Sequence, residues 1–589
     1  MPIVKILNLT NIMKKVFIFI ILIGLVSTIS AQEKWSRDSR SMPKPQVGNY
    51  SELPGNNYHW ENYNHTTKVY YTKDGVLSVG PSFRVLPNTH QQDEVILVRS
   101  YAHPLLMFGS ANTTVGSQFG QAEYITTDGG VTWSGSDVIP AFSYLTSDPA
   151  PTIDKDGRLI ITTLNTNNAA NTTMNSATST NNGATWLPNV VITSQNSDKN
   201  FSASDDVPSS AYYGRTYTVW TNFALAVSPI FVAYTTNGGT TWSAPSQINS
   251  PLANHYSQGA DITIGPGGEV YVCWASVTNG SLIEDYLGFA KSTNGGVNWT
   301  VTENAFDMNG IRAQMFNGWN FRVNSFPRIA VDRSGGPRNG WLYVVVSQIN
   351  LAPAGSDVDI VLHSSSDGGA TWSTGVRVNQ DALNNGKVQF FPAITVDPHG
   401  DVDICYYDNR NYPSVGDSCQ TFFSRSTDGG VTFTDVLASD HSWKVQNEPG
   451  AGTYGGDYIG ISWSNGKIYP FWFDLKTGSM QAWTCAIDIN PIAVNNISNE
   501  IPKNYKLQQN YPNPFNPETN IKFDVPKSGN VKLTVYDMLG NQVELLVNNF
   551  MEAGSYSTDF HANNLSSGVY FYRMESVNFS ETRKMILNK

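Results

Sequence analysis

The segment TTDGGVTW at residues 126–133 decides the fold, because five further segments repeat its pattern. Each copy reads Ser or Thr, any residue, Asp or Asn, any residue, Gly, any two residues, and then Trp or Phe. The other copies are STNNGATW (179–186), TTNGGTTW (235–242), STNGGVNW (292–299), SSDGGATW (365–372) and STDGGVTF (426–433). Self-similarity at intervals of 53 to 73 residues predicts a repeat architecture with one structural unit per copy.

Each copy has the chemistry of a tight turn between two strands. The Asp or Asn side chain can accept hydrogen bonds from nearby backbone N–H groups, and the Gly can adopt a positive φ. The terminal aromatic residue begins the next strand and offers a large apolar face. In the best-defined unit, strand-like runs at 326–332, 341–347 and 359–365 precede the turn. Each unit is therefore predicted to be a four-stranded sheet in which the octapeptide joins the third and fourth strands.

The octapeptide resembles the Asp-box, or BNR repeat, of the sialidase-like β-propellers, and six copies in register make the resemblance specific. It implies an all-β fold with an Asp-box β-propeller over residues 65–488. Strand-like runs at 458–464, 467–474 and 479–487 follow the last box, and residues 76–85 could supply a closing outer strand. This arrangement favours seven blades, while six blades, the number in sialidases, stays an alternative.

The composition is typical of an exported protein made of short strands. Charged residues make up only 14% of the chain, against about 25% in average soluble proteins. The net charge of −11 argues against a nucleic-acid partner, and we expect a monomer. Lys14 and Lys15 precede an apolar run that ends before Ala31, which predicts a signal peptide over residues 1–31. Residues 32–64 would form an N-terminal segment before the propeller.

No cofactor is evident from the sequence, and no residues have clear metal-ligand spacing. Asp198, Asp205 and Asp206 could offer oxygen ligands to a structural calcium ion, although turn capping is the simpler interpretation. Cys405 and Cys419 flank a predicted hairpin and could form a disulfide.

The sequence pattern and composition change after about residue 490. YPNPFNP (511–517), VYDMLG (535–540) and LSSGVY (565–570) resemble, in this order, the C-terminal sorting domain of type IX secretion system cargo. The resemblance implies a linker at 489–504 and a small C-terminal β-sandwich at 505–589. It also implies contact with the type IX secretion machinery, and secretion or outer-surface attachment in a Gram-negative bacterium. An accessory β-domain that binds another ligand is the alternative.

The resemblance to sialidases implies a specific chemistry. Their substrate carries a carboxylate on the anomeric carbon, so arginines hold it and a neutral Tyr, activated by a Glu, attacks it, with an Asp as acid/base. Candidates in the family's chain order are Arg84, Asp148, Glu284, Arg322, Arg410 and Tyr458. Each residue also has a structural interpretation, such as an Asp-Pro turn for Asp148, an ion pair with Asp408 for Arg410, or packing for Tyr458.

Two functions remain open at this point. The first is an exo-acting glycoside hydrolase for terminal sialic or related acidic sugars. The second is a non-catalytic propeller that binds a glycan or a protein at the cell surface, because a fold alone does not specify an activity. In sialidase-like propellers the ligand site lies on the face opposite the boxes, so the box residues themselves are expected to be structural.

Overall fold

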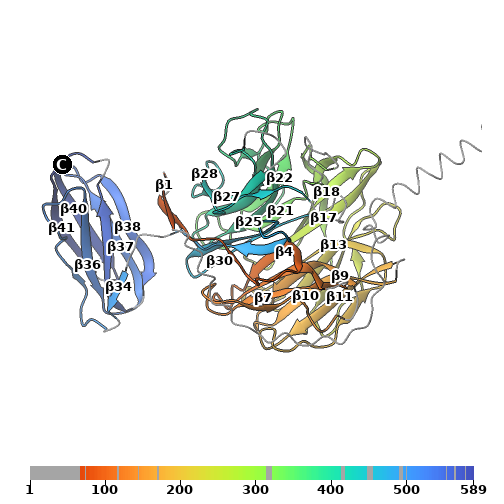
Figure 1. Ribbon diagram of the computed structural model, residues 1–589. Coiled ribbons are helices and arrows are strands. Elements are labelled where there is room, and N and C mark those ends of the chain that lie inside the picture. The colour runs from red at the N-terminus through yellow and green to blue at the C-terminus, as the bar shows by residue number, and fades with distance from the viewer. Residues whose placement is uncertain are drawn as a thin grey trace, which may run out of the picture. The chain divides into compact units, whose positions relative to one another are not determined.

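The computed structural model describes residues 67–589 apart from 73–74, 116–117, 143–144, 169–170, 313–320, 413–417, 447–455, 490–494, 499–500, 552, 563–564 and 578. The predicted signal peptide and N-terminal segment lie outside the described residues. The described part of the chain is all-β, as predicted, and contains no helix that could cross a membrane (Figure 1). Its contacts divide into two units: Pro81–Ala486, and Thr67–Gly80 together with Ile487–Lys589. The hairpin at 67–80, which falls inside the predicted propeller range, thus groups with the C-terminal residues.

The first unit contains seven antiparallel sheets within its described residues (Figure 1). Six of them use successive segments of the chain. Their main strands are β4 (Gln91–Arg99), β5 (Met107–Val115), β7 (Glu123–Thr126) and β8 (Ser134–Ser136) in sheet 1; β9 (Leu145–Ile153), β10 (Leu159–Asn168), β11 (Asn171–Ser179) and β12 (Val190–Thr193) in sheet 2; β13 (Ser197–Ser204), β14 (Thr216–Asn222), β15 (Ile230–Thr235) and β16 (Ser246–Gln247) in sheet 3; β17 (His255–Ile264), β18 (Val270–Thr278), β19 (Glu284–Ser292) and β20 (Thr300–Asp307) in sheet 4; β21 (Arg328–Val331), β22 (Leu342–Gln348), β23 (Asp359–Ser365) and β24 (Val376–Arg377) in sheet 5; and β25 (Gln389–Val396), β26 (Val402–Asp408), β27 (Ser418–Ser426) and β28 (Thr434–Leu437) in sheet 6. Two short strands add further pairings, β6 (Gln118–Gln121) with β5 and β29 (Trp443–Lys444) with β27.

Sheet 7 joins the two ends of the first unit. Its strands within the first unit are β30 (Gly460–Ser464), β31 (Lys467–Asp474), β32 (Gln481–Thr484) and β3 (Phe83–Arg84). Phe83 pairs with Thr484, and Arg84 pairs with Trp483. A closing strand was expected within residues 76–85, and the structure places it at β3. The pairing covers a sheet edge that would otherwise be exposed.

One strand of every sheet, here called the inner strand, contacts the inner strands of the two neighbouring sheets. It is the first strand of sheets 1–6 and β30 of sheet 7. The contacts run from β4 to β9, β13, β17, β21, β25 and β30, and β30 in turn contacts β4. Because this series returns to its starting strand, the seven sheets surround a common centre.

The six octapeptides form one and the same turn. In the first copy, the Thr126 hydroxyl donates to Asp128 Oδ1 at 2.8 Å and accepts from the Gly130 N–H at 2.8 Å. The Thr132 N–H donates to Asp128 Oδ1 at 2.9 Å. Equivalent hydrogen bonds recur in the five other copies. The turn role expected for Asp, Asn and Gly is thus observed at each tip.

The box aromatic residues also connect neighbouring sheets. The indole N–H of Trp186 in sheet 2 donates to Glu123 Oε2 of sheet 1 at 2.7 Å, and that of Trp242 in sheet 3 donates to Ser176 Oγ of sheet 2 at 2.8 Å. Trp372 of sheet 5 packs edge-on against Phe289 of sheet 4, with ring centroids 5.3 Å apart. Each box is therefore both a turn within its own sheet and a contact with the preceding one.

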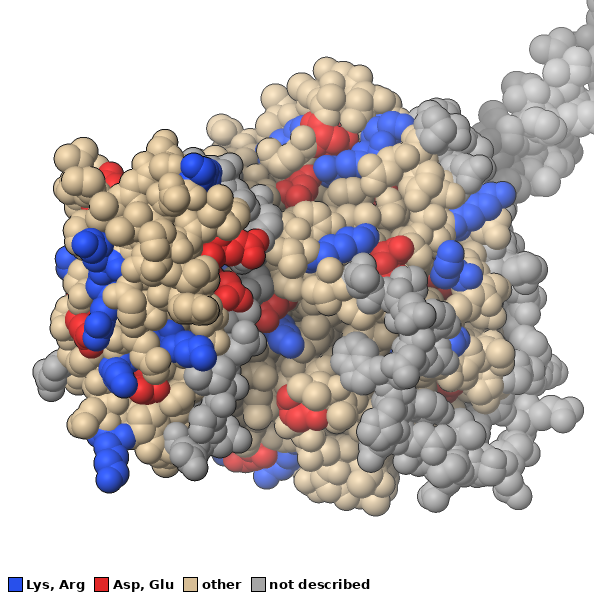
Figure 2. All heavy atoms as spheres, turned by 60° about the vertical axis from the view of Figure 1, so that its left-hand side comes forward, with Lys and Arg blue, Asp and Glu red and all other residues tan. Residues whose placement is uncertain are grey.

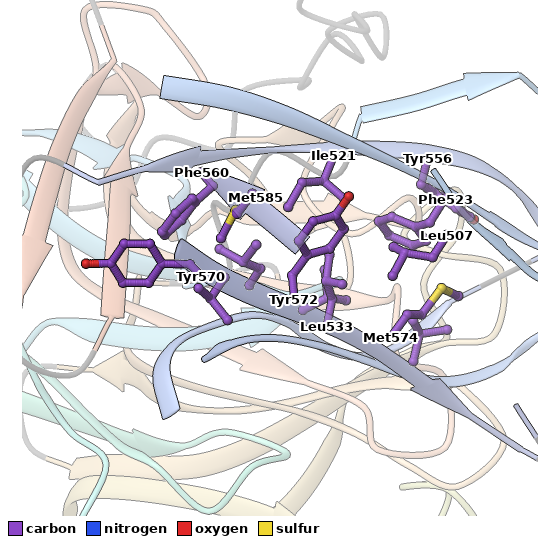
Figure 3. Close-up of a cluster of buried hydrophobic side chains, with 14 of the residues drawn as sticks. Leu507, Ile521, Phe523, Leu533, Tyr556, Phe560, Tyr570, Tyr572, Met574 and Met585 are labelled. Carbon is purple, nitrogen blue, oxygen red and sulfur yellow. The ribbon is translucent and has the colours of Figure 1, made fainter. Parts of the chain in front are cut away.

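The second unit contains two four-stranded sheets with a shared core (Figure 3). Buried and more exposed residues alternate along their strands, as in β36 and β40, so each sheet buries one face. The labelled side chains in Figure 3, among them Phe523 and Tyr572, lie between the strands of the two sheets. In order of pairing, the sheets are β34 (Asn495–Ser498), β39 (Gly554–His561), β36 (Glu518–Val525) and β35 (Lys506–Leu507), and β38 (Gln542–Met551), β37 (Gly529–Tyr536), β40 (Gly568–Ser576) and β41 (Phe579–Leu587). The unit also includes the hairpin β1 (Lys68–Thr72) and β2 (Gly75–Val79), and β33 (Ile487–Asp488), which pairs with β2.

The possible disulfide between Cys405 and Cys419 is not formed. Both residues are buried free thiols, and Cys405 Sγ lies 3.4 Å from the Gly460 carbonyl oxygen of sheet 7. Burial raises the pKa of both thiols above the usual value. These cysteines therefore serve as small apolar residues in the core.

Charged side chains are sparse on the face shown in Figure 2. Basic and acidic residues are interspersed there between large uncharged areas. The described residues on this face form no continuous basic surface, which agrees with the net charge of −11.

Candidate functional site

Five inner strands carry a bulge at an equivalent position. In β4, β9, β13, β17 and β25, two inner-strand residues lie opposite one residue of the second strand. The first residue of each bulge has a left-handed backbone, with φ between 51° and 71°; these residues are Glu94, Asp148, Lys199, Gly259 and Phe391. For residues other than Gly, this conformation costs about 1–2 kcal/mol. The recurrence of this strain at one level of the sheets marks a position where function is to be sought.

Three of the bulge residues line a small hollow of about 10 Å³. Lys199, Gly259 and Phe391 contribute to its wall, together with Phe201, Phe326, Pro327, Arg328, Pro392, Asp457 and Tyr458. The wall thus combines four aromatic rings with two cations and one carboxylate. The glycine is required, because a Cβ at position 259 would lie 2.3 Å from the Phe326 ring.

Lys199 is the most unusual group of this wall. Its side chain is buried, and its Nζ lies 3.3 Å from the centroid of the Tyr458 ring and 4.6 Å from that of Phe201. Within the described residues, the ammonium group has no hydrogen-bond partner. Burial lowers the pKa of Lys199 to about 8, although the Glu94 and Asp457 carboxylates oppose this shift.

Asp457 is the carboxylate of the wall. Its Oδ1 accepts hydrogen bonds from Arg322 Nη2 at 2.8 Å and from Asn324 Nδ2 at 2.9 Å. Burial acts to raise the pKa of Asp457. The charges of Arg322, Lys199 and Arg312 act in the opposite direction and hold the pKa below its usual value. Asp457 is therefore an ionised group beside the hollow at neutral pH.

The other two arginines near the hollow are also engaged. Arg328 donates from Nε to Asp261 Oδ2 at 2.9 Å and from Nη1 to the Ile459 carbonyl at 3.0 Å. Arg312 Nη1 donates to Gln258 Oε1 at 2.5 Å, and Gln258 in turn donates to Asp198 Oδ2 at 2.9 Å. These contacts hold neighbouring segments together and occupy guanidinium donors.

Glu284 stabilises the segment that connects sheets 4 and 5 through hydrogen bonds. Its Oε1 accepts the Ser325 N–H at 2.8 Å, and its Oε2 accepts the Arg312 N–H at 3.0 Å. The side chain is fully buried, and burial raises its pKa to about 7 against the opposing charge of Arg312. With both oxygens bound to backbone N–H groups, Glu284 acts as a positioning residue for this segment.

Four of the six candidate site residues lie in or next to this network. Tyr458 lines the hollow, and Arg322 binds Asp457. Asp148 is a bulge residue whose Oδ2 accepts the Lys199 N–H at 3.3 Å. Glu284 joins through Arg312, whose backbone N–H donates to its Oε2.

The other two candidates lie elsewhere. Arg84 is on β3, the closing strand of sheet 7, and its Nη1 donates to the Asn88 carbonyl at 3.3 Å. Arg410 binds Asp408 at 2.7 Å and Asp435 on the outer strand β28 at 2.7 Å. The structure therefore does not bring Arg84 or Arg410 to the hollow, and for Arg410 it agrees with the ion-pair interpretation.

Sequence reasoning did not single out Lys199, Asp457 or Phe391. The sequence nevertheless contains a signal for Lys199 and Phe391. Like Asp148, each of them lies six residues before an Asp that directly follows the end of the same strand. Those aspartates are Asp154, Asp205 and Asp397. This recurrence could have marked the bulge positions as equivalent before any coordinates were known.

The carboxylates considered for calcium have separate partners. Asp198 accepts from Gln258, Asp205 from Ser210 Oγ at 2.5 Å, and Asp206 binds Arg333 at 2.8 Å. In the described part of the chain, no three metal-ligating side chains come together. A calcium ion at this loop thus stays a prediction from the sequence.

Several solved structures are similar to this chain at low identity. A protein of unknown function from Dyadobacter fermentans has 11% identity and a TM-score of 0.37, covering 70% of this chain and 99% of that chain. A PL25 ulvan lyase has 11% identity and a TM-score of 0.42, covering 67% and 93%. A mutant of the NanB sialidase from Streptococcus pneumoniae has 8% identity and a TM-score of 0.37, covering 71% and 98%. Likenesses at this level assign neither an activity nor a ligand.

The C-terminal residues give a specific match. No curated protein sequence matches the chain significantly. Residues 509–588, however, match the family described as the secretion system C-terminal sorting domain. This match confirms the resemblance carried by the YPNPFNP, VYDMLG and LSSGVY segments and indicates that the protein is secreted. The chain ends in a secretion system C-terminal sorting domain.

Proposed function

We propose that this protein is an exported β-propeller that recognises a terminal acidic sugar through its acidic group, which would bind at the hollow formed by its inner strands. The seven sheets would be the blades of the propeller, and the two sheets of the second unit would form the β-sandwich of the sorting domain. The closed series of inner-strand contacts supports the first assignment, and the shared core supports the second.

The wall of the hollow is the observation that carries the proposal. Aromatic rings such as Phe201 and Tyr458 make much of the wall apolar and hold the Lys199 ammonium over their faces. Of the two lining cations, Arg328 is paired with Asp261, whereas the Lys199 ammonium has no hydrogen-bond partner among the described residues, so Lys199 could receive an anionic group. The volume of the hollow is about 10 Å³, room for about one water molecule, and is far below the roughly 300–1,000 Å³ of drug-sized pockets. Only a small acidic substituent at the end of a glycan would therefore reach the hollow, and the sugar ring would lie at its rim.

Calorimetric titration of the full-length exported protein tests this function. Sialyllactose and a glucuronate-terminated disaccharide are the acidic ligands, and lactose is the neutral control. Saturable binding of an acidic ligand with little binding of lactose is expected. Equal affinity for lactose, or no binding of either acidic sugar, would reject the proposal.

Hydrolysis is the second candidate, favoured by the position of Tyr458 in the wall beside Asp457. The activating base would be a carboxylate other than Glu284, because both Glu284 oxygens already accept backbone N–H groups. A fluorogenic sialoside provides the assay. Tyr458→Phe keeps the ring under Lys199 but removes the hydroxyl, so release should be lost in this variant and kept in the control Tyr234→Phe. Absence of release by the wild-type protein leaves a glycan-binding propeller.

Export is proposed to require both ends of the chain. The N-terminal segment ending near Ala31 would direct passage across the inner membrane, and the sorting domain would direct passage across the outer membrane. Deletion of residues 505–589 should retain the propeller in the periplasm. Normal secretion of the truncated chain would contradict this route.

A further inference from the structure

The arginines near the hollow are committed to partners within the chain. Arg322 binds Asp457, Arg328 binds Asp261 and a backbone carbonyl, and Arg312 binds Gln258. A guanidinium binds a carboxylate most strongly through two parallel N–H donors. These contacts already occupy one or two of the five N–H donors on each side chain, so fewer donors are left for an incoming acid.

Lys199 is held in a different way. It is 3% exposed, lines the hollow and lies over aromatic rings, with its Nζ 3.3 Å from the Tyr458 centroid, 4.6 Å from Phe201 and 5.6 Å from Phe326. A cation–π contact attracts the ammonium without using its N–H donors as a hydrogen bond would. None of these donors has a partner among the described residues. The ammonium is thus positioned and still able to donate.

The backbone explains why the lysine lies there. Lys199 is the left-handed residue of the β13 bulge, with φ 54°, and it is followed by Asn200, whose Nδ2 donates to the Thr162 carbonyl at 3.0 Å. Its own N–H donates to Asp148 Oδ2 at 3.3 Å. Contacts on both sides of the residue therefore fix the bulge independently of the ammonium group.

We infer that the Lys199 ammonium, rather than an arginine cluster, is the group that binds the acidic substituent of the ligand. This inference rests on the proposed function and deepens it. The ligand class is a sugar with an exposed oxyanion, either a carboxylate or a sulfate ester, which accepts one or more of the Lys199 N–H donors. Lys199 would then determine specificity for acidic over neutral sugars.

If Lys199 serves ligand binding, removal of its charge should not destabilise the free protein, whereas a purely structural role predicts a loss of stability. A buried ammonium without a hydrogen-bond partner lowers the stability of the fold. Lys199→Met keeps an unbranched side chain of similar length and removes the charge. The free protein should therefore be at least as stable in this variant, while its affinity for acidic sugars falls about 10- to 100-fold, as expected for the loss of a charged hydrogen bond.

The pH dependence provides an independent measurement. Glu94, Asp148 and Asp457 are the carboxylates that face Lys199, and Arg328 is the cation that faces it. With the pKa of Lys199 at about 8, the ammonium loses its charge as the pH rises above that value. Affinity of the wild-type protein for an acidic sugar should therefore decrease between pH 7 and pH 9. Lys199→Arg keeps its charge over this range, so any binding it retains should not show this decrease.

The decisive experiment measures affinities of the full-length wild-type protein, Lys199→Met, Lys199→Arg and the control Lys155→Met at pH 7 and pH 9. Lys155 pairs with Asp156 at an exposed site. One arm uses sialyllactose and a glucuronate-terminated disaccharide, and the other uses a 6-sulfated disaccharide, so the two arms identify the oxyanion. Weak binding by Lys199→Met with normal binding by Lys155→Met is expected.

Three outcomes would overturn the inference. If Lys199→Met binds acidic sugars as the wild type does, Lys199 is not the receptor, although the proposed function survives. If wild-type affinity is constant from pH 7 to pH 9, the ammonium is not the receptor, and this result does not depend on whether a variant folds. If the wild-type protein binds no acidic ligand in either arm, the proposed function fails together with the inference.

Discussion

The glycine at the fifth position of each box should be required for the contact between neighbouring sheets, and Gly369→Ala tests this requirement. Gly369 has φ 88°, and a Cβ at this position would lie 2.1 Å from Phe289 Cε1 and 2.3 Å from Phe289 Cζ. Phe289 belongs to the preceding sheet, is 3% exposed and packs edge-on against Trp372. Because its ring is enclosed, it cannot move away without disturbing the core.

The cost of Gly369→Ala has two parts. A left-handed backbone costs alanine about 1–2 kcal/mol relative to glycine, and forcing an extra methyl group into a packed core costs about 1–3 kcal/mol. Gly478→Ala is the matched control, because Gly478 has φ 93° but no atom within 4 Å of an added Cβ. The control should therefore show only the backbone part. The two substitutions are expected to differ by about 1–3 kcal/mol.

Unfolding in guanidinium chloride, monitored by tryptophan fluorescence, measures this difference in the free energy of unfolding. All 15 tryptophans precede residue 487, so the signal does not come from the C-terminal unit. Phe289→Leu should make room for the methyl group and reduce the cost of Gly369→Ala to that of the control. Equal costs for Gly369→Ala and Gly478→Ala in the wild-type background would refute the proposed contact between box and neighbouring sheet.

Substitutions at three further positions test the box and two buried titratable groups by the same unfolding assay. Asp367→Ala removes the acceptor of the Thr371 N–H and should cost about 1 kcal/mol, as for a lost helix cap, whereas Asp367→Asn, which matches three other boxes, should cost little. Glu284 has a pKa raised from 4.5 to about 7, so the wild-type protein should lose up to about 3 kcal/mol as the pH rises through this window; Glu284→Gln should flatten that profile, and an unchanged slope would contradict the assignment. Burial alone would lower the pKa of His441, but its hydrogen bonds with Asp440 and Asp474 raise it from 6.5 to about 9. His441→Asn should therefore destabilise the protein by up to about 3 kcal/mol below pH 6.5, with the difference lost as the pH rises through 9.

The repeat could be predicted from the sequence because its turn is a local structure. The Ser or Thr, the Asp or Asn and the Gly of a box satisfy one another within five residues, as Thr126, Asp128 and Gly130 do. Residues at such short separation need no distant partner, so their pattern specifies the same turn wherever it occurs. The predicted order of strands around each box follows from these turns.

Arg84 shows where a local pattern was insufficient. The residue was expected both near a closing outer strand and in the catalytic cluster, and these two places are incompatible in a ring of sheets. Its pairing with Trp483 puts it on the outer strand of sheet 7. Arg84 and Trp483 are almost 400 positions apart in the sequence. They pair because sheet 7 lacks an outer strand, and the residues around Arg84 do not show which sheet this is.

The burial of the Lys199 side chain was beyond sequence reasoning for a different physical reason. A lysine in a polar segment is usually a solvated surface charge, and nothing in the sequence of residues 197–204 contradicts this interpretation. The residue is buried for two reasons. In the β13 bulge, Lys199 and Asn200 together lie opposite the single residue Trp220. Phe201, Phe326 and Tyr458, which come from three separate segments, surround the ammonium group. Since the bulge, the rings and the facing carboxylates are each fixed by contacts between sheets, the lowered pKa and the available donors of Lys199 are properties of the assembled ring. An account of ligand binding by this protein must therefore start from the bulge positions of the inner strands, where side chains from several sheets meet, and not from the boxes that identify the fold.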